Sequence, residues 1–339
     1  MEEKQNMKKI LSLVIATLMI LTVCGCVEEP PLPAESTPEA SQSESMSESV
    51  SEAEPKDTDP HPSETEPEGT EPGESESPTE TTEEPDTPIV SEPLKVMSYN
   101  VYTTDPNRLR VGKVVNNIKS FDPDVIGVQE LNYAWISLLN RTTDMFDTYE
   151  MVGEPRQDPS DKSNGNEYSA IFYKKDKFNL IETDTYWLSD TPDKISKFDG
   201  TEYYRIMTYA VLERRSDGEK FIHVNTHLAY DKATRNKQVP VLLSLADELL
   251  KKHGNLPIFF TGDFNMSKKA ATYSVMLDWN LDDTRYLFDP ANTEDTHQVD
   301  GIIDYCFVSK DDFDVITFDV GFGLEGSDHY PVYVEMYIK

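Results

Sequence analysis

Acidic, amide and histidine side chains recur at the ends of apolar segments along this 339-residue chain. They are Asn100, Gln129, Glu130, His227, Asp263, Asn265, Asp304, Asp328 and His329. If the apolar segments are neighbouring strands, the strand ends that carry these side chains lie next to one another. The side chains would then meet along one rim of a sheet, the edge formed by these strand ends. Such a cluster is rich in oxygen and lacks thiolates, so it suits a hard cation such as Mg²⁺ or Mn²⁺ better than structural zinc.

The elements that must position these side chains begin at Leu94. Alternation and short apolar runs predict strands at residues 94–100, 124–130, 168–173, 178–188, 204–214, 219–228, 256–261, 302–308, 313–320 and 330–338. Helical spacing predicts helices at residues 108–121, 134–143, 232–252 and 268–278, the third of which Gly254 would end. Many strands with helices between some of them favour two packed sheets flanked by helices.

The N-terminus has the features of a targeting signal. An apolar run at residues 10–23 follows Lys8 and Lys9; it is shorter than the roughly 20 residues of a membrane-spanning helix and has the proportions of a secretory signal. The run ends in Val23-Cys24-Gly25-Cys26, which resembles the lipobox of bacterial lipoproteins. The resemblance implies cleavage after residue 25 and a diacylglyceryl group on Cys26, hence an extracytoplasmic protein anchored to the cell membrane by lipid alone. An ordinary signal peptide is the alternative.

Cleavage there leaves two cysteines, Cys26 and Cys306. A framework of disulfide bonds is therefore excluded, in spite of the oxidising location. Cys306 lies inside an apolar run, so we expect it to be a small core residue.

Residues 26–93 are predicted to be a disordered acidic stalk that starts at the lipidated Cys26. Residues 27–93 contain 21 acidic residues, one basic residue and no Phe, Tyr or Trp, while Glu, Ser, Pro and Thr supply 50 of these 67 positions. So little apolar surface does not offset the entropy of folding. A folded domain is accordingly expected at residues 94–339.

The charge of the chain argues against one class of partner. Of the formal net charge of −32, the stalk carries −20 and residues 94–339 carry −13. A protein that grips duplex DNA by neutralising many phosphates with Lys and Arg is therefore disfavoured. An enzyme that binds phosphate through a metal ion is not disfavoured by this charge.

Six short segments, in this order, resemble the motifs of the endonuclease/exonuclease/phosphatase superfamily, which includes pancreatic deoxyribonuclease, abasic-site endonucleases and neutral sphingomyelinases. They are Met97-Ser98-Tyr99-Asn100, Val128-Gln129-Glu130-Leu131, Asn225-Thr226-His227-Leu228, Thr261-Gly262-Asp263-Phe264-Asn265, Ile303-Asp304-Tyr305 and Ser327-Asp328-His329-Tyr330-Pro331-Val332. The resemblance covers residues 94–339. It implies an α/β (α+β) fold, a four-layer αββα sandwich of two mainly antiparallel mixed sheets, and metal-assisted hydrolysis of a phosphoester.

The resemblance also implies which residues hold the Mg²⁺ or Mn²⁺ ion. Glu130 would be the main carboxylate ligand, with Asn100 beside it. Asp328 would be a further ligand or would orient one. A cation there polarises phosphoryl oxygens and stabilises charge on the leaving oxygen.

For the reaction itself, the resemblance implies that His329, oriented by Asp304, bonds the phosphate or activates water. Asp263 and Asn265 would position the attacking water and the scissile phosphate. The general base stays open between Asp263 and His329.

A second dyad is implied by the same resemblance. His227 would pair with the carboxylate of Glu167 and donate to the leaving group. Arg205 would contact phosphate, a role that suits its planar fork.

Other candidate residues have weaker patterns. His297, in a loop before Asp304, would either reach the substrate or serve as a capping or solvated residue. His223 and His253 are assigned to a strand and a helix end without function, and Trp187 to core packing rather than to stacking on a ligand.

The remaining question is the substrate. We expect a phosphoester hydrolase, most simply a nuclease or general phosphodiesterase that acts on nucleic acid or another phosphoester as a monomer. A phosphomonoesterase for sugar or inositol phosphates and a sphingomyelinase-like lipid phosphodiesterase are the alternatives. A non-catalytic surface binding protein is disfavoured, because none of the superfamily's core positions is missing.

Overall fold

The computed structural model of this protein describes residues 92–339. The predicted signal peptide, Cys26 and nearly all of the predicted stalk lie outside the described residues. Within residues 92–339, the helices are all too short or too polar to cross a membrane.

Two six-stranded sheets form the centre of the fold. The first sheet has the order β11 (Phe313–Val320), β12 (Val332–Ile338), β1 (Leu94–Asn100), β2 (Val125–Leu131), β4 (Tyr168–Lys174) and β3 (Tyr149–Val152). The second has the order β5 (Phe178–Trp187), β6 (Ile206–Arg214), β7 (Lys220–His227), β8 (Ile258–Asp263), β10 (Asp304–Ser309) and β9 (Leu281–Asp283). β1 and β2 are parallel, as are β7 and β8, and the other neighbours are antiparallel.

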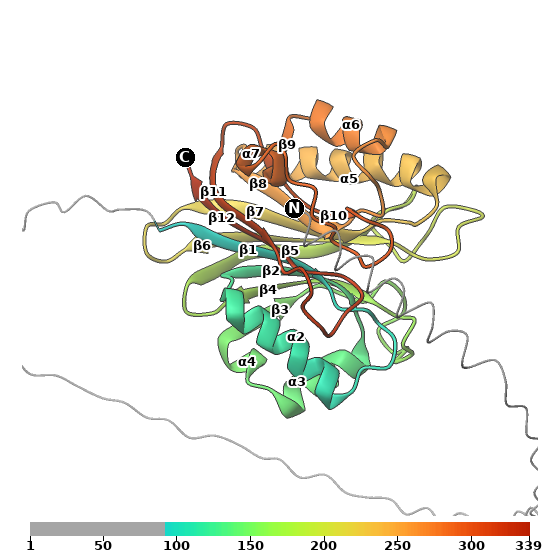
Figure 1. The fold of residues 1–339 in the computed structure, drawn as a ribbon. Coiled ribbons are helices and arrows are strands. Elements are labelled where there is room, and N and C mark those ends of the chain that lie inside the picture. The colour runs from blue at the N-terminus through green and yellow to red at the C-terminus, as the bar shows by residue number, and fades with distance from the viewer. Residues whose placement is uncertain (1–91) are drawn as a thin grey trace, which may run out of the picture. The chain divides into compact units, whose positions relative to one another are not determined.

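Helices cover the outer face of each sheet (Figure 1). The first sheet is covered by α2 (Arg108–Phe121), α3 (Tyr133–Thr142) and α4 (Met145–Thr148), and the second by α5 (Lys232–His253), α6 (Ala271–Asp278) and α7 (Thr284–Phe288). Apolar side chains form three buried clusters, one between the sheets and one under each set of helices. The expected four-layer sandwich of mixed sheets is confirmed.

Polar side chains join the two sheets where they approach most closely. Asn225 of β7 donates from Nδ2 to the carbonyl oxygens of Val128 (3.0 Å) and Ala170 (2.8 Å) in the opposite sheet, and its Oδ1 accepts from Gln129 Nε2 at 2.7 Å. Gly127 makes this approach possible: a Cβ atom there would lie 2.0 Å from Thr261 Oγ1. The register of one sheet on the other is therefore fixed close to the strand ends.

Most elements lie where the sequence predicts them. The helix at Arg108–Phe121 and the strand at Leu94–Asn100 have the predicted bounds, and Gly254 ends α5 at a φ of 79°. The last strand starts two residues later than predicted, at Val332, since Pro331 before it has no N–H to donate. β3, α4, β9 and α7 were not predicted, because each has only three to five residues and shows no periodicity.

Candidate active site

The strand register brings the predicted acids and histidines to one rim. In the second sheet Asp263 of β8 is paired with His227 of β7 on one side and with Asp304 of β10 on the other. In the first sheet Asn100 of β1 is paired with Gln129, next to Glu130 in β2. The ends of β1, β2, β7, β8 and β10 therefore bring their polar residues together.

Asn100 links the two sheets at this rim. Its Nδ2 donates to Glu130 Oε1 in the same sheet and to Asp263 Oδ2 in the other, each at 3.1 Å. Its Oδ1 accepts from the main-chain N–H of Tyr102 at 3.0 Å. Carboxylates from both sheets thus converge on one buried amide.

The backbone of Glu130 departs from the regular strand pairing of β2. Its φ is 59°, and the pairing of β2 with β4 shifts register between Val128 and Leu131. Such a bulge re-aims a side chain, and a non-glycine residue in the left-handed region costs of order 1 kcal/mol. Glu130 Oε2 accepts from the main-chain N–H of Thr103 at 2.9 Å, which fixes the carboxylate toward the rim.

Asp263 lies between two histidines. Its Oδ2 is 3.3 Å from His227 Nε2 and 3.7 Å from His329 Nε2, and its Oδ1 accepts from the main-chain N–H of Asn265 at 2.9 Å. Burial and the nearby negative charge of Asp304 raise the pKa of Asp263 to about 7. This carboxyl group can therefore take up or release a proton near neutral pH.

His329 forms a buried pair with Asp304. His329 Nδ1 lies 2.9 Å from Asp304 Oδ2 and 3.2 Å from Oδ1. Burial alone would lower the pKa of His329, but the charge and hydrogen bond of Asp304, with further contributions from Asp263 and Asp328, raise it to about 10. His329 is therefore a cation at neutral pH that presents Nε2–H toward Asp263.

His227 is a neutral imidazole in the same cluster. Burial, followed by the positive charges of Arg205 and Arg156, lowers its pKa well below the ordinary value. Its Nε2 also lies 3.1 Å from Asn265 Nδ2, while Nδ1 has no hydrogen-bond partner among the described residues. The short distance from His227 to Asp263 is therefore a contact with a neutral ring and not an ion pair.

Glu167 has a different partner from the one expected. Arg156, and not His227, holds it: Arg156 Nη1 lies 2.8 Å from Glu167 Oε2, and Nη2 donates to Oε1 at 3.2 Å. Arg205 Nη1 lies 4.0 Å from Oε2. Burial raises the pKa of Glu167 to about 7, and Arg156 opposes this rise.

Arg156 was not identified from the sequence, since a single arginine in a loop has no motif around it. The fold places it by an isolated bridge between Pro155 and Tyr168, and by Trp187, whose Nε1 donates to the Arg156 carbonyl oxygen at 2.8 Å. The guanidinium groups of Arg156 and Arg205 lie 5.1 and 5.7 Å from the ring centre of Tyr203. Trp187 is buried, as its assignment to the core requires.

The other predicted histidines lie outside the cluster. His223 is buried, and its Nε2 lies 2.7 Å from Thr261 Oγ1, while His253 at the end of α5 lies 3.4 Å from Glu182 Oε2. Cys306 is buried in the cluster between the sheets, as expected of a core residue.

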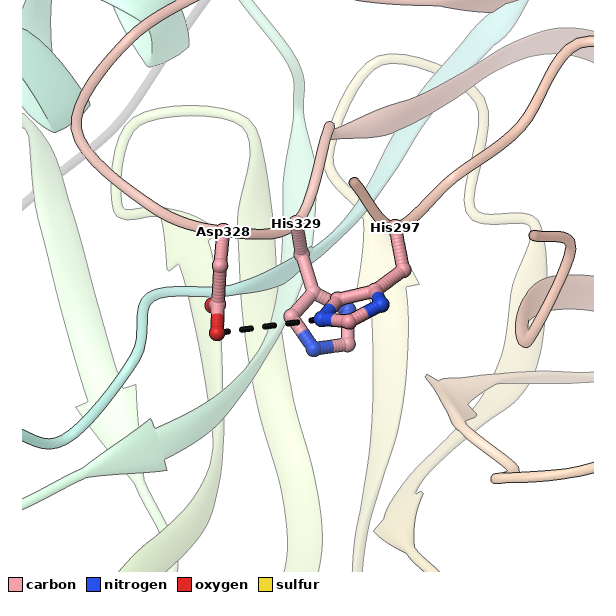
Figure 2. Close-up of side chains that lie close together, drawn as sticks. All are labelled: His297, Asp328 and His329. Atoms are coloured by element: carbon pink, nitrogen blue, oxygen red, sulfur yellow. Dashed lines mark ion pairs between the residues drawn. The ribbon is translucent and has the colours of Figure 1, made fainter. Parts of the chain in front are cut away.

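Asp328 lies close to His297. Its Oδ2 lies 3.7 Å from His297 Nε2, and the His297 and His329 ring centres are 4.5 Å apart (Figure 2). Ser327 Oγ donates to the Asn100 carbonyl oxygen at 2.7 Å, so the Ser327–His329 segment is attached to the end of β1. Of the predicted ligands, Glu130 and Asn100 touch each other, and Asp328 lies beside them in a second group.

Two hollows open beside the cluster. One has a volume of about 510 Å³ and is lined by Thr103, Glu130, Arg156, Arg205 and His227, among others. The other has a volume of about 410 Å³, and its walls include Tyr102, Arg110, Lys113, Gln298 and Asp328. Because Tyr102 lines the second hollow while Thr103 and Thr104 line the first, the two hollows adjoin at this short segment.

The residues around Asn100 suit a hard divalent cation. One ligand atom each from Glu130, His227 and Asp263 lie within 4.8 Å of one another. Asp304 and Glu130 both raise the pKa of Asp263, so negative charge is in excess at this point. A cation held by carboxylate and amide oxygens would offset that excess.

Comparison with known proteins identifies this arrangement. The sequence model described as the "Endonuclease/Exonuclease/phosphatase family" matches residues 97–329. The CCR4-Not complex 3'-5'-exoribonuclease subunit Ccr4 of Saccharomyces cerevisiae is 27% identical over 194 residues, which cover 49% of this chain and 23% of that protein. The chain thus matches less than a quarter of the length of that relative.

Two solved bacterial structures have the same fold. The endonuclease/exonuclease/phosphatase from Bacteroides vulgatus has a TM-score of 0.64 at 22% identity and covers 74% of this chain and 100% of its own. A mannosyl-6-phosphatase of Bacteroides thetaiotaomicron has a TM-score of 0.62 at 26% identity, with 72% and 100% covered. The chain therefore belongs to the endonuclease/exonuclease/phosphatase family, whose members are phosphoester hydrolases.

Proposed function

We propose that this protein is a divalent-metal-dependent phosphodiesterase that acts, as a nuclease or a general phosphodiesterase, outside the cytoplasm. The observation that supports a diester substrate best is the pair of hollows that adjoin at the Tyr102–Thr104 segment. A phosphodiester has a substituent on each side of its phosphorus atom. Each hollow would receive one of the two.

Asp263 is proposed as the general base. Its pKa of about 7 suits a group that removes a proton from water near neutral pH, whereas the pKa of His329, about 10, leaves that residue protonated. His329 is accordingly a donor to a phosphoryl oxygen, oriented by Asp304. We therefore favour Asp263 over His329 as the general base.

Glu130 and Asn100 are proposed to hold Mg²⁺ or Mn²⁺, with Asp328 beside them. When bound, the cation would polarise the phosphoryl oxygens and stabilise charge on the leaving oxygen. Asn100 has its Nδ2, not its Oδ1, toward the two carboxylates. Rotation of this amide by about half a turn would present the oxygen instead, with loss of the hydrogen bond that Oδ1 now accepts from the Tyr102 N–H.

Arg205, Arg156 and Asn265 are proposed to bind the phosphate group of the substrate. Arg205 Nε is buried and has no hydrogen-bond partner among the described residues, and the same hollow contains Arg156 and His227. A guanidinium fork binds phosphate oxygens in pairs. His227, a neutral imidazole near Asn265, would donate a hydrogen bond to the leaving group, while Glu167 would hold Arg156 in place.

A phosphomonoesterase for sugar phosphates is the second candidate. Two arginines in one hollow beside Glu130 suit a doubly charged terminal phosphate. One relative of known structure, 26% identical, is a mannosyl-6-phosphatase. The two candidates differ in the bond that is cut and in the product.

Parallel assays of the purified chain with Mg²⁺ separate these candidates. The substrates are bis-4-nitrophenyl phosphate, plasmid DNA, RNA, mannose 6-phosphate, inositol phosphates and sphingomyelin. Cleavage of the synthetic diester or of a nucleic acid, without release of inorganic phosphate, supports the phosphodiesterase. Release of inorganic phosphate from mannose 6-phosphate or an inositol phosphate supports the phosphomonoesterase, and no turnover of any substrate contradicts both.

We propose further that the protein is attached to the cell membrane through a lipid on Cys26, with an acidic stalk that carries the catalytic domain away from the surface. The Val23-Cys24-Gly25-Cys26 motif and the composition of residues 27–93 support this proposal. Expression in a bacterial host tests it. The unaltered chain should partition into detergent, and Cys26→Ser into the aqueous phase; equal partition would contradict the anchor.

A further inference from the structure

His297 is held in one tautomer by its own loop. Its Nδ1 accepts the main-chain N–H groups of Asp300 at 2.8 Å and of Val299 at 3.3 Å. Asp300 Oδ2 also lies 3.3 Å from Nδ1, but a nitrogen that accepts two N–H groups carries no proton. In a neutral imidazole the proton is then on Nε2, which makes that atom a fixed donor.

This donor faces the carboxylate of Asp328. Nε2 lies 3.7 Å from Asp328 Oδ2, slightly beyond the roughly 2.7–3.2 Å of a hydrogen bond. Figure 2 shows the two imidazole rings beside this carboxylate, with His297 and Asp328 joined by the dashed line. The side chain of Asp328 is 35% exposed and that of His297 only 12%. His297 is therefore the fixed member of the pair, and Asp328 is the one with room to move.

Within residues 92–339, one other side chain is close enough to donate to Asp328. The hydroxyl of Ser327 lies 3.4 Å from Asp328 Oδ1, but its single proton is donated to the Asn100 carbonyl oxygen at 2.7 Å. The guanidinium of Arg110 is bonded to the carbonyl oxygens of Val101, Tyr102, Thr104 and Gly326. The orientation of the Asp328 carboxylate therefore depends on His297.

The main chain around His297 is attached to both catalytic segments. Gln298 N–H donates to the Asp328 carbonyl oxygen at 3.0 Å, and Tyr330 N–H donates to the Thr296 carbonyl oxygen at 2.7 Å. Thr296 Oγ1 accepts the N–H of Asp304 at 3.0 Å. A side chain on this segment keeps a constant position relative to Asp304, Asp328 and His329.

We propose that His297 is a positioning residue whose Nε2–H donates to the Asp328 carboxylate and sets the direction in which this carboxylate faces the proposed cation. The inference rests on the proposed function, because it requires a cation near Glu130 and Asn100. Groups that orient a metal ligand through a hydrogen bond typically contribute 10- to 100-fold to metal affinity. His297 would thus act on metal binding through Asp328, without touching the substrate.

Two substitutions separate the donor from the loop contacts. In His297→Asn the Oδ1 atom can accept the N–H groups that Nδ1 accepts now, but no donor reaches Asp328. In His297→Gln the side-chain amide N–H lies about as far from the main chain as Nε2 of histidine does, so a donor can still reach Asp328. Mn²⁺ is titrated into the purified full chain and its two variants, and the free ion is followed by electron paramagnetic resonance; thermal melting of each protein without metal checks the fold.

The expected result is a loss of about tenfold or more in Mn²⁺ affinity for His297→Asn, with melting unchanged and a smaller loss for His297→Gln. Unchanged Mn²⁺ affinity in His297→Asn would overturn the proposal. So would weaker binding of inorganic phosphate with Mn²⁺ binding intact, which would make His297 a substrate contact. If the unaltered chain hydrolyses the diester and binds Mn²⁺, and His297→Asn binds Mn²⁺ with the same affinity, only this inference fails. If the unaltered chain binds no Mn²⁺, the proposed function fails as well.

A measurement on the unaltered chain tests the tautomer directly, even if both variants fail to fold. Long-range ¹H–¹⁵N correlation spectra distinguish the protonated from the unprotonated ring nitrogen. A proton on Nε2 of His297 and none on Nδ1 is expected. A proton on Nδ1 would overturn the proposal.

Discussion

His329 Nδ1 lies 2.9 Å from Asp304 Oδ2, and both side chains are buried. Asp304 begins β10 in one sheet and His329 lies just before β12 in the other, so this contact crosses between the sheets. The position of the histidine therefore depends on how the two sheets pack. Its charge depends on the same contact.

Removing the imidazole tests its role in the reaction. His329→Ala is expected to lower kcat by roughly 10²-fold or more, the usual effect of a positioned proton donor. Asp304→Asn should also lower kcat, because the ring loses the carboxylate that orients it. Steady-state kinetics on the synthetic diester measures both, with His253→Gln, at the far end of α5, as a control that keeps the full rate. A near-normal rate for His329→Ala would show that the assignment is wrong.

Asp263 and His329 should make the stability of the metal-free protein fall as the pH rises from 5 to 9, whereas the buried imidazoles of His223 and His227, whose pKa values are lowered, act in the opposite direction below about pH 6.5. The pKa of Asp263 is raised to about 7 and that of His329 to about 10, so these two groups bind more protons in the folded chain than in the unfolded chain. For His329 the stabilisation is complete below about pH 6.5, the unfolded value, and is lost as the pH rises through about 10. For Asp263 the loss extends from the unfolded value of 3.8 to about 7.

Urea unfolding in excess EDTA at several pH values measures this dependence. The stability of Asp263→Asn, which cannot ionise, should rise relative to that of the unaltered chain between pH 5 and 7 and follow the same course between pH 7 and 9. If the stability of the variant depends on pH between 5 and 7 just as that of the unaltered chain does, Asp263 is not the source of this dependence.

Arg156 should matter for both stability and substrate binding. Arg156→Met leaves the buried Glu167 without its main partner, and breaking one side of a buried ion pair costs about 3–5 kcal/mol. Arg156→Met with Glu167→Gln should recover part of that loss in urea unfolding. The substrate KM should remain raised in both, since the guanidinium is absent; a normal KM would remove Arg156 from the phosphate site.

Gly127 should tolerate no side chain. A Cβ at this position would lie 2.0 Å from Thr261 Oγ1 and 2.5 Å from Asn225 Oδ1, in the polar contact between the sheets. Gly127→Ala is expected to lower the free energy of unfolding by at least about 1–3 kcal/mol. Gly112→Ala in α2 is the matched control, because nothing lies within 4 Å of its Cβ and alanine favours a helix by about 1 kcal/mol. Equal stabilities would contradict the close approach of the sheets.

The sequence predicts the long elements well, because their periodicity reflects one buried face. The helix Arg108–Phe121 and the strand Leu94–Asn100 are examples. Short elements such as Leu281–Asp283 are strands only because β10 is there to pair with, and no local pattern reports that. Asp263 and His329 could be placed at the rim because each lies at the end of a strand.

The partners of the site residues are harder to predict than the residues themselves. Glu167 was expected to pair with His227, but its closest ion pair and its side-chain hydrogen bond are with Arg156, eleven residues earlier. His297 was placed in a loop without a definite role, and its closeness to Asp328 follows from main-chain pairing with the His329 segment. Such contacts depend on how loops fold back on the sheets, which a pattern of apolar residues does not encode.

Hydrolysis of bis-4-nitrophenyl phosphate by the purified full chain, with Mg²⁺ and with excess EDTA, tests the central claim most directly. The acid cluster around Asn100 and the two hollows beside it lead us to expect release of 4-nitrophenol with Mg²⁺, none with EDTA, and recovery when Mg²⁺ is restored. Glu130→Gln should need far more Mg²⁺ for the same rate. Full turnover in EDTA by a protein shown to retain no metal would contradict the account.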